Sequence, residues 1–236
     1  MPAANIGAWI RIGVWALPVY GLLTFWTTLD PQPDPTKHYE AWARYVTTNH
    51  YVLTHVLGSG LGTVLAIFGV FALGDYLANS RVGRLGLVAM VMTVMGHALF
   101  LMVIGVSAFS APEEGQAYLA GIEEFSKLPD IFADTMFAVT SLLVIVLGFV
   151  GNVLLGVAVW RSGTLPKWAG VLWAAAAVFM YPLGIVYAAV ILGVQSTPRT
   201  VLIGALLIVA SGAWMSLSVL RRPSAEAAGT AQPRVR

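Results

Sequence analysis

Six long apolar runs, separated by short polar stretches, account for most of this chain. The runs cover approximately residues 5–29, 51–74, 85–109, 136–160, 168–193 and 201–220. Each reaches the roughly 20 residues that an α-helix needs to cross a hydrocarbon layer about 30 Å thick. A backbone inside lipid must satisfy its own hydrogen bonds, so runs of this length form helices. The pattern predicts an all-α, six-helix transmembrane bundle as one domain over residues 1–222, followed by a disordered tail over 223–236.

Composition agrees with a chain surrounded by lipid. Of its 236 residues, 58% are hydrophobic and only 10% are charged, whereas soluble domains carry about 25% charged residues. The lipid bilayer is therefore the expected partner. A net charge of +2 without a basic stripe gives no indication of nucleic-acid binding. The chain contains no cysteine, which excludes disulfides, thiol chemistry and iron–sulfur clusters.

The distribution of charge predicts the orientation. Basic residues concentrate in the second and fourth loops and after the sixth run: Arg81, Arg84, Arg161, Lys167, Arg221 and Arg222. Acidic residues concentrate in the first and third loops: Asp30, Asp34, Glu40, Glu113, Glu114, Glu123, Glu124 and Asp130. Because cytoplasmic loops carry the excess of Lys and Arg, we expect a multi-pass protein of the inner (plasma) membrane with both termini in the cytoplasm.

The sequence of the third loop predicts a helix within the loop itself. Ser110-Ala-Pro-Glu113 matches a capping box, which begins a helix. Apolar residues then recur at helical spacing over 118–125, and Pro129 ends the segment. We expect a short amphipathic helix on the outer membrane surface.

Three ionisable side chains lie inside the runs: Arg11, His55 and His97. Arg11 is near the inner end of its helix and can reach the headgroups. His97 lies near mid-membrane, with Thr93 one turn before it, and Ser59 follows His55 on the same face. Because ionisable groups inside a membrane are costly, both histidines are candidates for function. The alternative is that each is a neutral histidine that packs helices together.

A stripe of polar and small residues marks one face of the fourth helix. Asp130, Asp134, Ser141, Gly148 and Asn152 follow one another at spacings of four, seven, seven and four. Positions that face lipid would be apolar, so this face is expected to point into the bundle. Asp134 either stabilises the helix start or provides a carboxylate at the mouth of an outward-opening pocket.

The fifth helix carries a break near its middle at Tyr181-Pro182, where proline frees a backbone carbonyl. Together these features predict a lipophilic small molecule bound in an outward-opening intramembrane pocket. One form of this hypothesis is a membrane enzyme of lipid or isoprenoid type. In that hypothesis His97, Asp134 or His55 acts as acid or base. Thr93, Ser141, Asn152, Tyr181 and Ser59 bind the ligand.

Other functional classes remain open from the sequence. The first is a transporter or substrate-capture subunit without chemistry of its own, because broken helices border transporter sites. The second is a redox anchor holding haem b between His55 and His97, although their depths differ by about 12 Å. The third is a structural partner in a larger membrane complex or homo-oligomer. The haem alternative aside, the sequence predicts no cofactor or metal, and whether the protein is an enzyme stays undecided.

Overall fold

The computed structural model describes residues 6–30, 32–122, 135–191 and 199–221. Six helical segments within these residues are long and apolar enough to cross a membrane: Gly7–Thr27, Asn49–Ala78, Gly83–Leu119, Thr135–Ser162, Lys167–Tyr187 and Arg199–Leu220. They confirm the predicted all-α fold with six helices of membrane-spanning length. The predicted tail over 223–236 lies outside the described residues.

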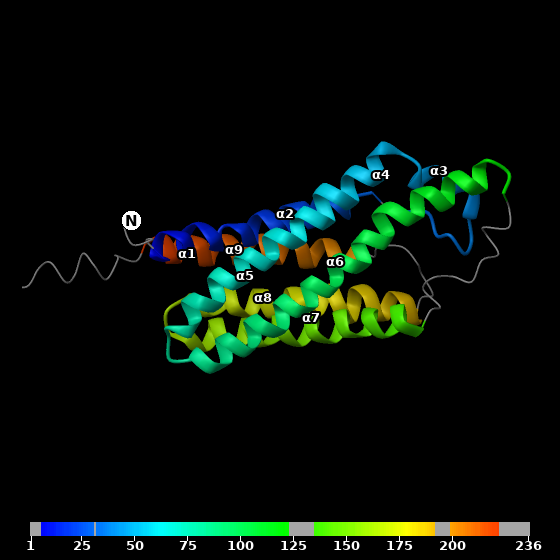
Figure 1. Ribbon diagram of the computed structural model, residues 1–236. Helices are drawn as coiled ribbons and strands as arrows, with labels where there is room; N and C mark the ends of the chain where they lie inside the picture. The colour runs from blue at the N-terminus through cyan, green and yellow to red at the C-terminus, as the bar shows by residue number, and fades with distance from the viewer. Residues whose placement is uncertain (1–5, 31, 123–134, 192–198, 222–236) are drawn as a thin grey trace, which may run out of the picture.

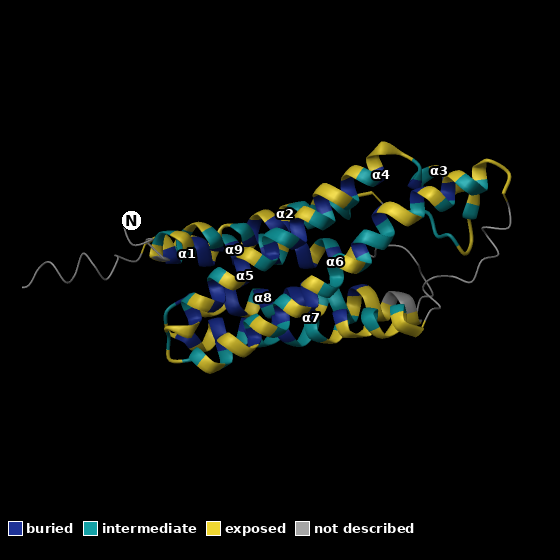
Figure 2. Ribbon diagram, viewed as in Figure 1, coloured by how far each residue is buried: buried dark blue, intermediate teal, exposed yellow. Residues whose placement is uncertain are grey.

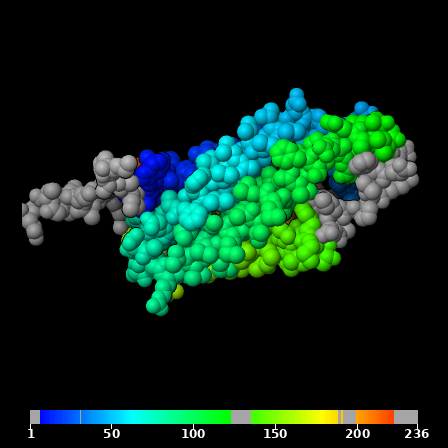
Figure 3. All heavy atoms as spheres, in the orientation of Figure 1, coloured from blue at the N-terminus to red at the C-terminus, as the bar shows by residue number. Residues whose placement is uncertain are grey.

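Figure 1 shows the spanning segments lengthwise in one bundle. Their contacts close a ring in chain order. The ring is built from α1 (Ile6–Val14), α2 (Ala16–Thr27), α5 (Gly62–Ala78), α6 (Gly83–Leu119), α7 (Thr135–Ser162), α8 (Lys167–Met180) and α9 (Arg199–Leu220). Each helix from α5 onward contacts the next, and α2 contacts both α5 and α9, which closes the ring. In a space-filling view, α6 crosses one face between the second segment and α7 (Figure 3).

Glycines allow neighbouring helices in this ring to approach closely. Gly96 of α6 faces Gly148 of α7 so tightly that a Cβ on Gly96 would lie 2.7 Å from the Gly148 backbone nitrogen. Similar contacts occur around the rest of the ring: Gly69 with Leu17, Gly86 with Leu77, Gly156 with Ala174, Gly204 with Met180 and Gly212 with Pro18. Small residues suit helix packing in lipid, where no hydrophobic effect drives helices together.

The two ends of the ring differ in charge and structure. At the basic end, the α5–α6 and α7–α8 turns lie together, and the Arg81 Nε donates a 2.5 Å hydrogen bond to the Arg161 carbonyl. At the acidic end, α3 (Tyr39–Val46) and α4 (Asn49–Leu53) pack against the far part of α6. The sequence pattern did not predict α3, because it is only eight residues long and its first turn lacks a side-chain cap.

Three of the spanning segments are irregular. In the first, a break at Trp15 separates α1 from α2, because Pro18 provides no N–H for the Val14 carbonyl. The second contains a π-helix, η1 (Thr54–Leu61), and the fifth continues beyond α8 as a second π-helix, η4 (Tyr181–Ile191). The predicted break at Tyr181-Pro182 is confirmed, since α8 ends at Met180. Such π-helical turns are rare and often accompany functional sites.

The third segment is longer than predicted. The capping box at Ser110 was expected to begin a separate helix, but Ser110 lies inside the continuous helix α6, and so does Pro112. Packing against α3 holds this extension, with Gly115 against Val46 and the Ala43 carbonyl. That contact offsets the loss of the backbone hydrogen bond that Pro112, which has no N–H, cannot donate. The rest of the predicted loop helix, from residue 123 to its expected end at Pro129, lies outside the described residues.

The glycine contact between α6 and α7 predicts a position-specific effect on stability. Gly96→Ala should lower the thermal midpoint by the equivalent of about 1–3 kcal/mol, because the nearest atoms are backbone and cannot move aside. The control is Gly105→Ala in the same helix, where a Cβ meets nothing within 4 Å. That variant should match or slightly exceed wild type. Thermal unfolding of the full chain in detergent measures both, and equal midpoints for the two variants would contradict the contact.

Candidate functional site

A group of polar and aromatic side chains meets in the centre of the ring, level with the middle of α7. We call Tyr20, His97, Asn152, Trp173 and Tyr181 the central polar cluster. They come from α2, α6, α7, α8 and the start of η4, so four of the six spanning segments contribute. His97 is only 4% exposed, and the Tyr20 ring packs edge-on to it at 5.7 Å between ring centroids.

The surroundings of His97 determine which of its nitrogens carries the proton. Its Nδ1 lies 2.8 Å from the Thr93 carbonyl oxygen. A carbonyl can only accept, so Nδ1 carries the hydrogen, and Nε2 of the neutral ring has a lone pair. The expected pairing of His97 with Thr93 is therefore present, but it uses the backbone. The Thr93 hydroxyl instead donates to the Ala89 carbonyl at 2.8 Å.

Asn152 connects three elements. Its Nδ2 donates to the Gly148 carbonyl at 2.8 Å, and its Oδ1 accepts a 3.0 Å hydrogen bond from the indole Nε1 of Trp173. The Tyr181 hydroxyl lies over the bare Cα of Gly148, where a side chain would collide with it. The predicted stripe on the fourth helix thus does face the bundle interior at Gly148 and Asn152.

The centre of the ring is almost filled. A cavity of about 10 Å³ remains between α2, α7, α8 and α9, and its polar lining consists of Tyr20, Asn152, Trp173 and Tyr181. This is close to the smallest space that holds one water molecule. A lipophilic ligand does not fit at this level.

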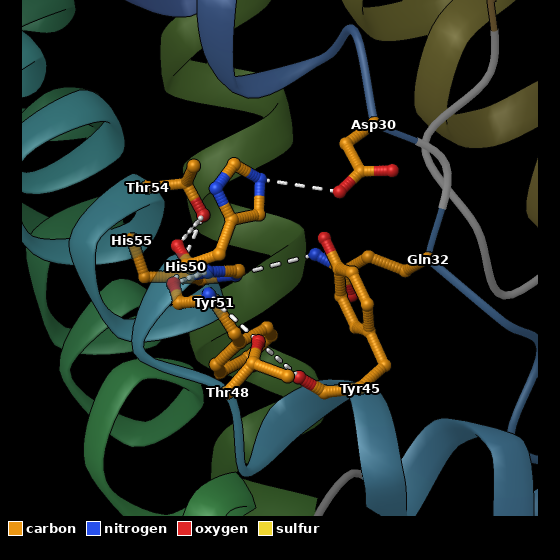
Figure 4. A network of polar contacts seen from close by, with 8 residues as sticks. All are labelled: Asp30, Gln32, Tyr45, Thr48, His50, Tyr51, Thr54 and His55. Carbon is orange, nitrogen blue, oxygen red and sulfur yellow. Dashed lines mark hydrogen bonds and ion pairs between the residues drawn. The ribbon is translucent and has the colours of Figure 1, made fainter.

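Toward the acidic end, the loop before α3, helix α4 and the start of η1 bring together a second polar group, shown in Figure 4. We call Asp30, Gln32, His50, Tyr51 and His55 the outer polar cluster. The Nδ1 of His55 donates to the Tyr51 carbonyl at 2.9 Å, which leaves Nε2 to accept from the Gln32 amide at 3.3 Å. The imidazole also lies over the Tyr51 ring, 4.0 Å between centroids.

The outer polar cluster joins the loop before α3 to α4. His50 Nε2 lies 3.1 Å from a carboxylate oxygen of Asp30, with both side chains about half exposed. Burial, followed by the negative charge of Asp30, raises the pKa of the neighbouring Tyr45 to about 12. Burial also raises the pKa of Tyr39, whose hydroxyl donates a 2.6 Å hydrogen bond to Glu114 and thereby ties α3 to α6.

The predicted site residues fall into separate groups. His97, Thr93, Asn152 and Tyr181 come together at the centre, whereas His55 belongs to the outer polar cluster. Ser59 and Ser141 are half-buried on η1 and α7. Asp134 lies outside the described residues.

Sequence reasoning did not predict Tyr20 and Trp173 as members of the central polar cluster. It identified His55 alone among the members of the outer polar cluster, and so missed Asp30, Gln32, His50 and Tyr51. Trp173 offered a signal, because it lies inside the fifth apolar run, away from the interfaces where tryptophan is usually enriched. Tyr20, two residues after Pro18, offered a weaker one. Gln32 offered none, since a single amide in a polar loop is ordinary.

The arrangement bears on the haem alternative. An axial histidine ligand needs a free nitrogen lone pair, and His55 uses its own to accept from Gln32. His97 has one such nitrogen, with the Tyr20 ring packed beside it. Among the described residues, no group of three or more His, Asp or Glu side chains is arranged to hold a metal ion.

The contact between Asn152 and Trp173 predicts a measurable coupling. Asn152→Leu should lower stability by about 1–3 kcal/mol, because it leaves the buried indole N–H without an acceptor. Trp173→Phe removes that donor, so the double variant should lose less than the two single variants combined. A double-mutant cycle on thermal unfolding in detergent measures this difference. Strict additivity would mean that the hydrogen bond contributes nothing.

The raised pKa of Tyr45 predicts sensitivity to alkali. The unfolded chain ionises this tyrosine near pH 10, and the folded chain only near pH 12. The contribution of Tyr45 to the stability of the folded state is therefore intact below pH 10 and is lost as the pH rises toward 12. Tyr45→Phe should therefore lose less thermal stability than wild type between pH 9 and 11. The exposed Tyr187→Phe serves as control, and an equal loss in wild type and Tyr45→Phe would refute the expectation.

Comparisons with protein-family models, with curated proteins and with solved structures found no match. A functional proposal for this chain therefore rests on its own residues, above all on the two polar clusters and the helices that position them.

Proposed function

We propose that the protein binds a lipophilic small molecule inside the membrane, in the half of the bundle nearer the acidic end. The polar group of the ligand contacts the central polar cluster, and its apolar part lies between diverging helices above that cluster. The observation that carries the proposal is the combination of a loosely packed outer half with a buried polar base.

The outer part of α7 is more exposed than the rest of the helix. Of the buried residues of α7, only Val144 precedes Gly148, whereas the remainder follow it. Met136 and Leu142 in that outer part are 72% and 59% exposed. Figure 2 shows the same contrast along the helix, and in Figure 1 the outer parts of α6 and α7 diverge.

The outer part of α6 has other partners. Ser107 accepts a 2.9 Å hydrogen bond from the Tyr51 hydroxyl, and Gly115 packs on Val46 of α3. The second spanning segment, α3 and the part of α6 nearer the acidic end therefore form one group of helices, which we call the first arm. The start of α9 and η4 make the other arm, joined by contacts such as Gly184 with Val201. Outer α7 lies on this side, since α7 contacts η4 at Gly148 and Tyr181. Because the arms separate above Gly96 and Gly148, an elongated apolar molecule can enter between them from the lipid.

The base between the arms defines the polar group of the ligand. His97 Nε2 is a hydrogen-bond acceptor, and the hydroxyls of Tyr20 and Tyr181 can donate or accept. A lipophilic alcohol or phenol matches these groups, since its hydroxyl donates to the imidazole and accepts from a tyrosine. If the protein is an enzyme, His97 is the group that takes a proton from such a hydroxyl.

Transport is the second candidate, and η4 is the observation that favours it. The helix changes from α to π geometry at Tyr181, beside the cluster and next to Pro182. Interrupted helices at mid-membrane border the sites of many transporters. In either case we propose that the basic end faces the cytoplasm, with both termini there, because Arg81, Arg84 and Arg161 all lie at that end.

Copurifying molecules test the proposal. The protein is purified in nanodiscs, extracted with organic solvent, and the lipophilic compounds are quantified by mass spectrometry per mole of protein. Ser141→Trp fills the space between the arms, because Ser141 lies two turns beyond Gly148 on the same face of α7. It should abolish retention. His97→Phe should weaken retention about tenfold through loss of one hydrogen bond.

The matched control is Leu142→Trp, which adds the same bulk at a position already 59% exposed. It should retain the compound as wild type does. Equal retention by Ser141→Trp and Leu142→Trp, or no compound above the nanodisc lipid background in wild type, would overturn the proposal. Uptake of the identified compound into vesicles then separates transport from binding or turnover.

A further inference from the structure

A second hollow lies at the basic end, remote from the central polar cluster. It has a volume of about 320 Å³ and is bordered by α1, the end of α5, the α7–α8 turn and the end of α9. Its polar lining consists of Arg11, Tyr76, Asn79, Ser80 and Thr164. This size falls at the lower end of the range for small-molecule sites.

Two hydroxyl groups in this hollow lack partners. The Tyr76 Oη and the Thr164 Oγ1 are shielded from solvent, yet neither forms a hydrogen bond within the part of the chain that the structure describes. Their neighbours are satisfied: Ser80 Oγ donates to the Leu77 carbonyl, and Asn79 Nδ2 donates to the Asp75 carbonyl. Buried hydroxyls are nearly always hydrogen-bonded, so two in one hollow indicate an absent acceptor.

The charge of this end identifies that acceptor as an anion. Arg11 lines the hollow, and Arg81, Arg84 and Arg161 occupy the same end of the bundle. Asp75, the acidic residue of this end among those described, is exposed and does not line the hollow. An anion there would accept hydrogen bonds from both hydroxyls and pair with the guanidinium of Arg11.

The hollow is separate from the centre of the ring. Its lining shares no residue with the central polar cluster. Leu77, Leu165 and Met215, with exposed fractions of 0%, 6% and 0%, belong to the apolar core at this end. The basic-end hollow is therefore independent of the ligand proposed above.

We propose that this hollow binds a phosphate group. Phosphate offers several acceptor oxygens to converging donors, and arginine matches its geometry. Arg11 lies in the second turn of the first membrane span, at the depth where anionic headgroups meet helix ends. The phosphate belongs either to an anionic phospholipid of the adjacent leaflet or to a soluble compound, and the recognition chemistry is the same for both.

Binding to the full-length protein in neutral detergent tests this site. The probes are dioleoyl phosphatidic acid, dioleoyl phosphatidylcholine as the neutral comparison, and inorganic phosphate against chloride at equal ionic strength. Phosphatidic acid or inorganic phosphate should raise the thermal midpoint of wild type as its concentration increases. A shift with phosphatidic acid alone identifies a lipid ligand, and a shift with inorganic phosphate identifies a soluble one.

Two sets of variants separate the site from general attraction to positive charge. Tyr76→Phe combined with Thr164→Val removes both hydroxyls and should weaken binding of the active probe at least about tenfold. Arg11→Gln should do the same, whereas Arg84→Gln, an exposed arginine of the same end outside the hollow, should bind as wild type does.

Folding is controlled within the experiment. Neither hydroxyl has a partner among the described residues, so without probe the double variant should melt at or above the wild-type temperature. Thr164→Ser keeps a hydroxyl at this position. As a single variant with Tyr76 unchanged, it should bind the active probe as wild type does. The proposal is overturned if neither anion shifts wild type, if the double variant binds normally, or if Arg84→Gln loses as much affinity as Arg11→Gln.

Discussion

Close approach of helix backbones at glycine is the contact on which the rest of this structure depends. Within lipid, apolar side chains gain little by turning toward each other, so helix association relies on contact area and packing. Gly96 against Gly148, and Gly151 against Thr93, bring α6 and α7 together at mid-membrane. The same contacts carry His97 and Asn152 to a common level, so the geometry of the central polar cluster follows from the glycines.

Tight packing at one end and separation at the other give the bundle two different halves. Large buried side chains such as Leu73, Leu77, Leu155 and Met215 fill the basic half. In the acidic half, α6 turns to α3 and α4 for its contacts, and α7 keeps few of its own. In the proposed function, the tightly packed half holds the polar groups in place, and the ligand enters through the more exposed half.

His55 and His97 show how equal local geometry serves different surroundings. Each donates through Nδ1 to the carbonyl four residues earlier, at 2.9 and 2.8 Å. That bond fixes the tautomer and directs Nε2 away from the backbone of its own helix. At His55, Gln32 takes up the free nitrogen, whereas at His97 the neighbour is the edge of an aromatic ring. The two residues therefore differ in what a ligand could reach.

The sequence alone determined the six spanning helices, because length and apolarity suffice to define them, and it identified His97, Asn152 and the break at Tyr181. It did not determine that α6 continues past Ser110, nor that Tyr20 and Trp173 join the cluster. Those outcomes depend on contacts between residues far apart in the chain, such as α3 against Gly115 and Asn152 against Trp173. Local pattern cannot specify them, because an interior proline or a mid-membrane tryptophan is stable only when a neighbouring helix supplies the missing contact.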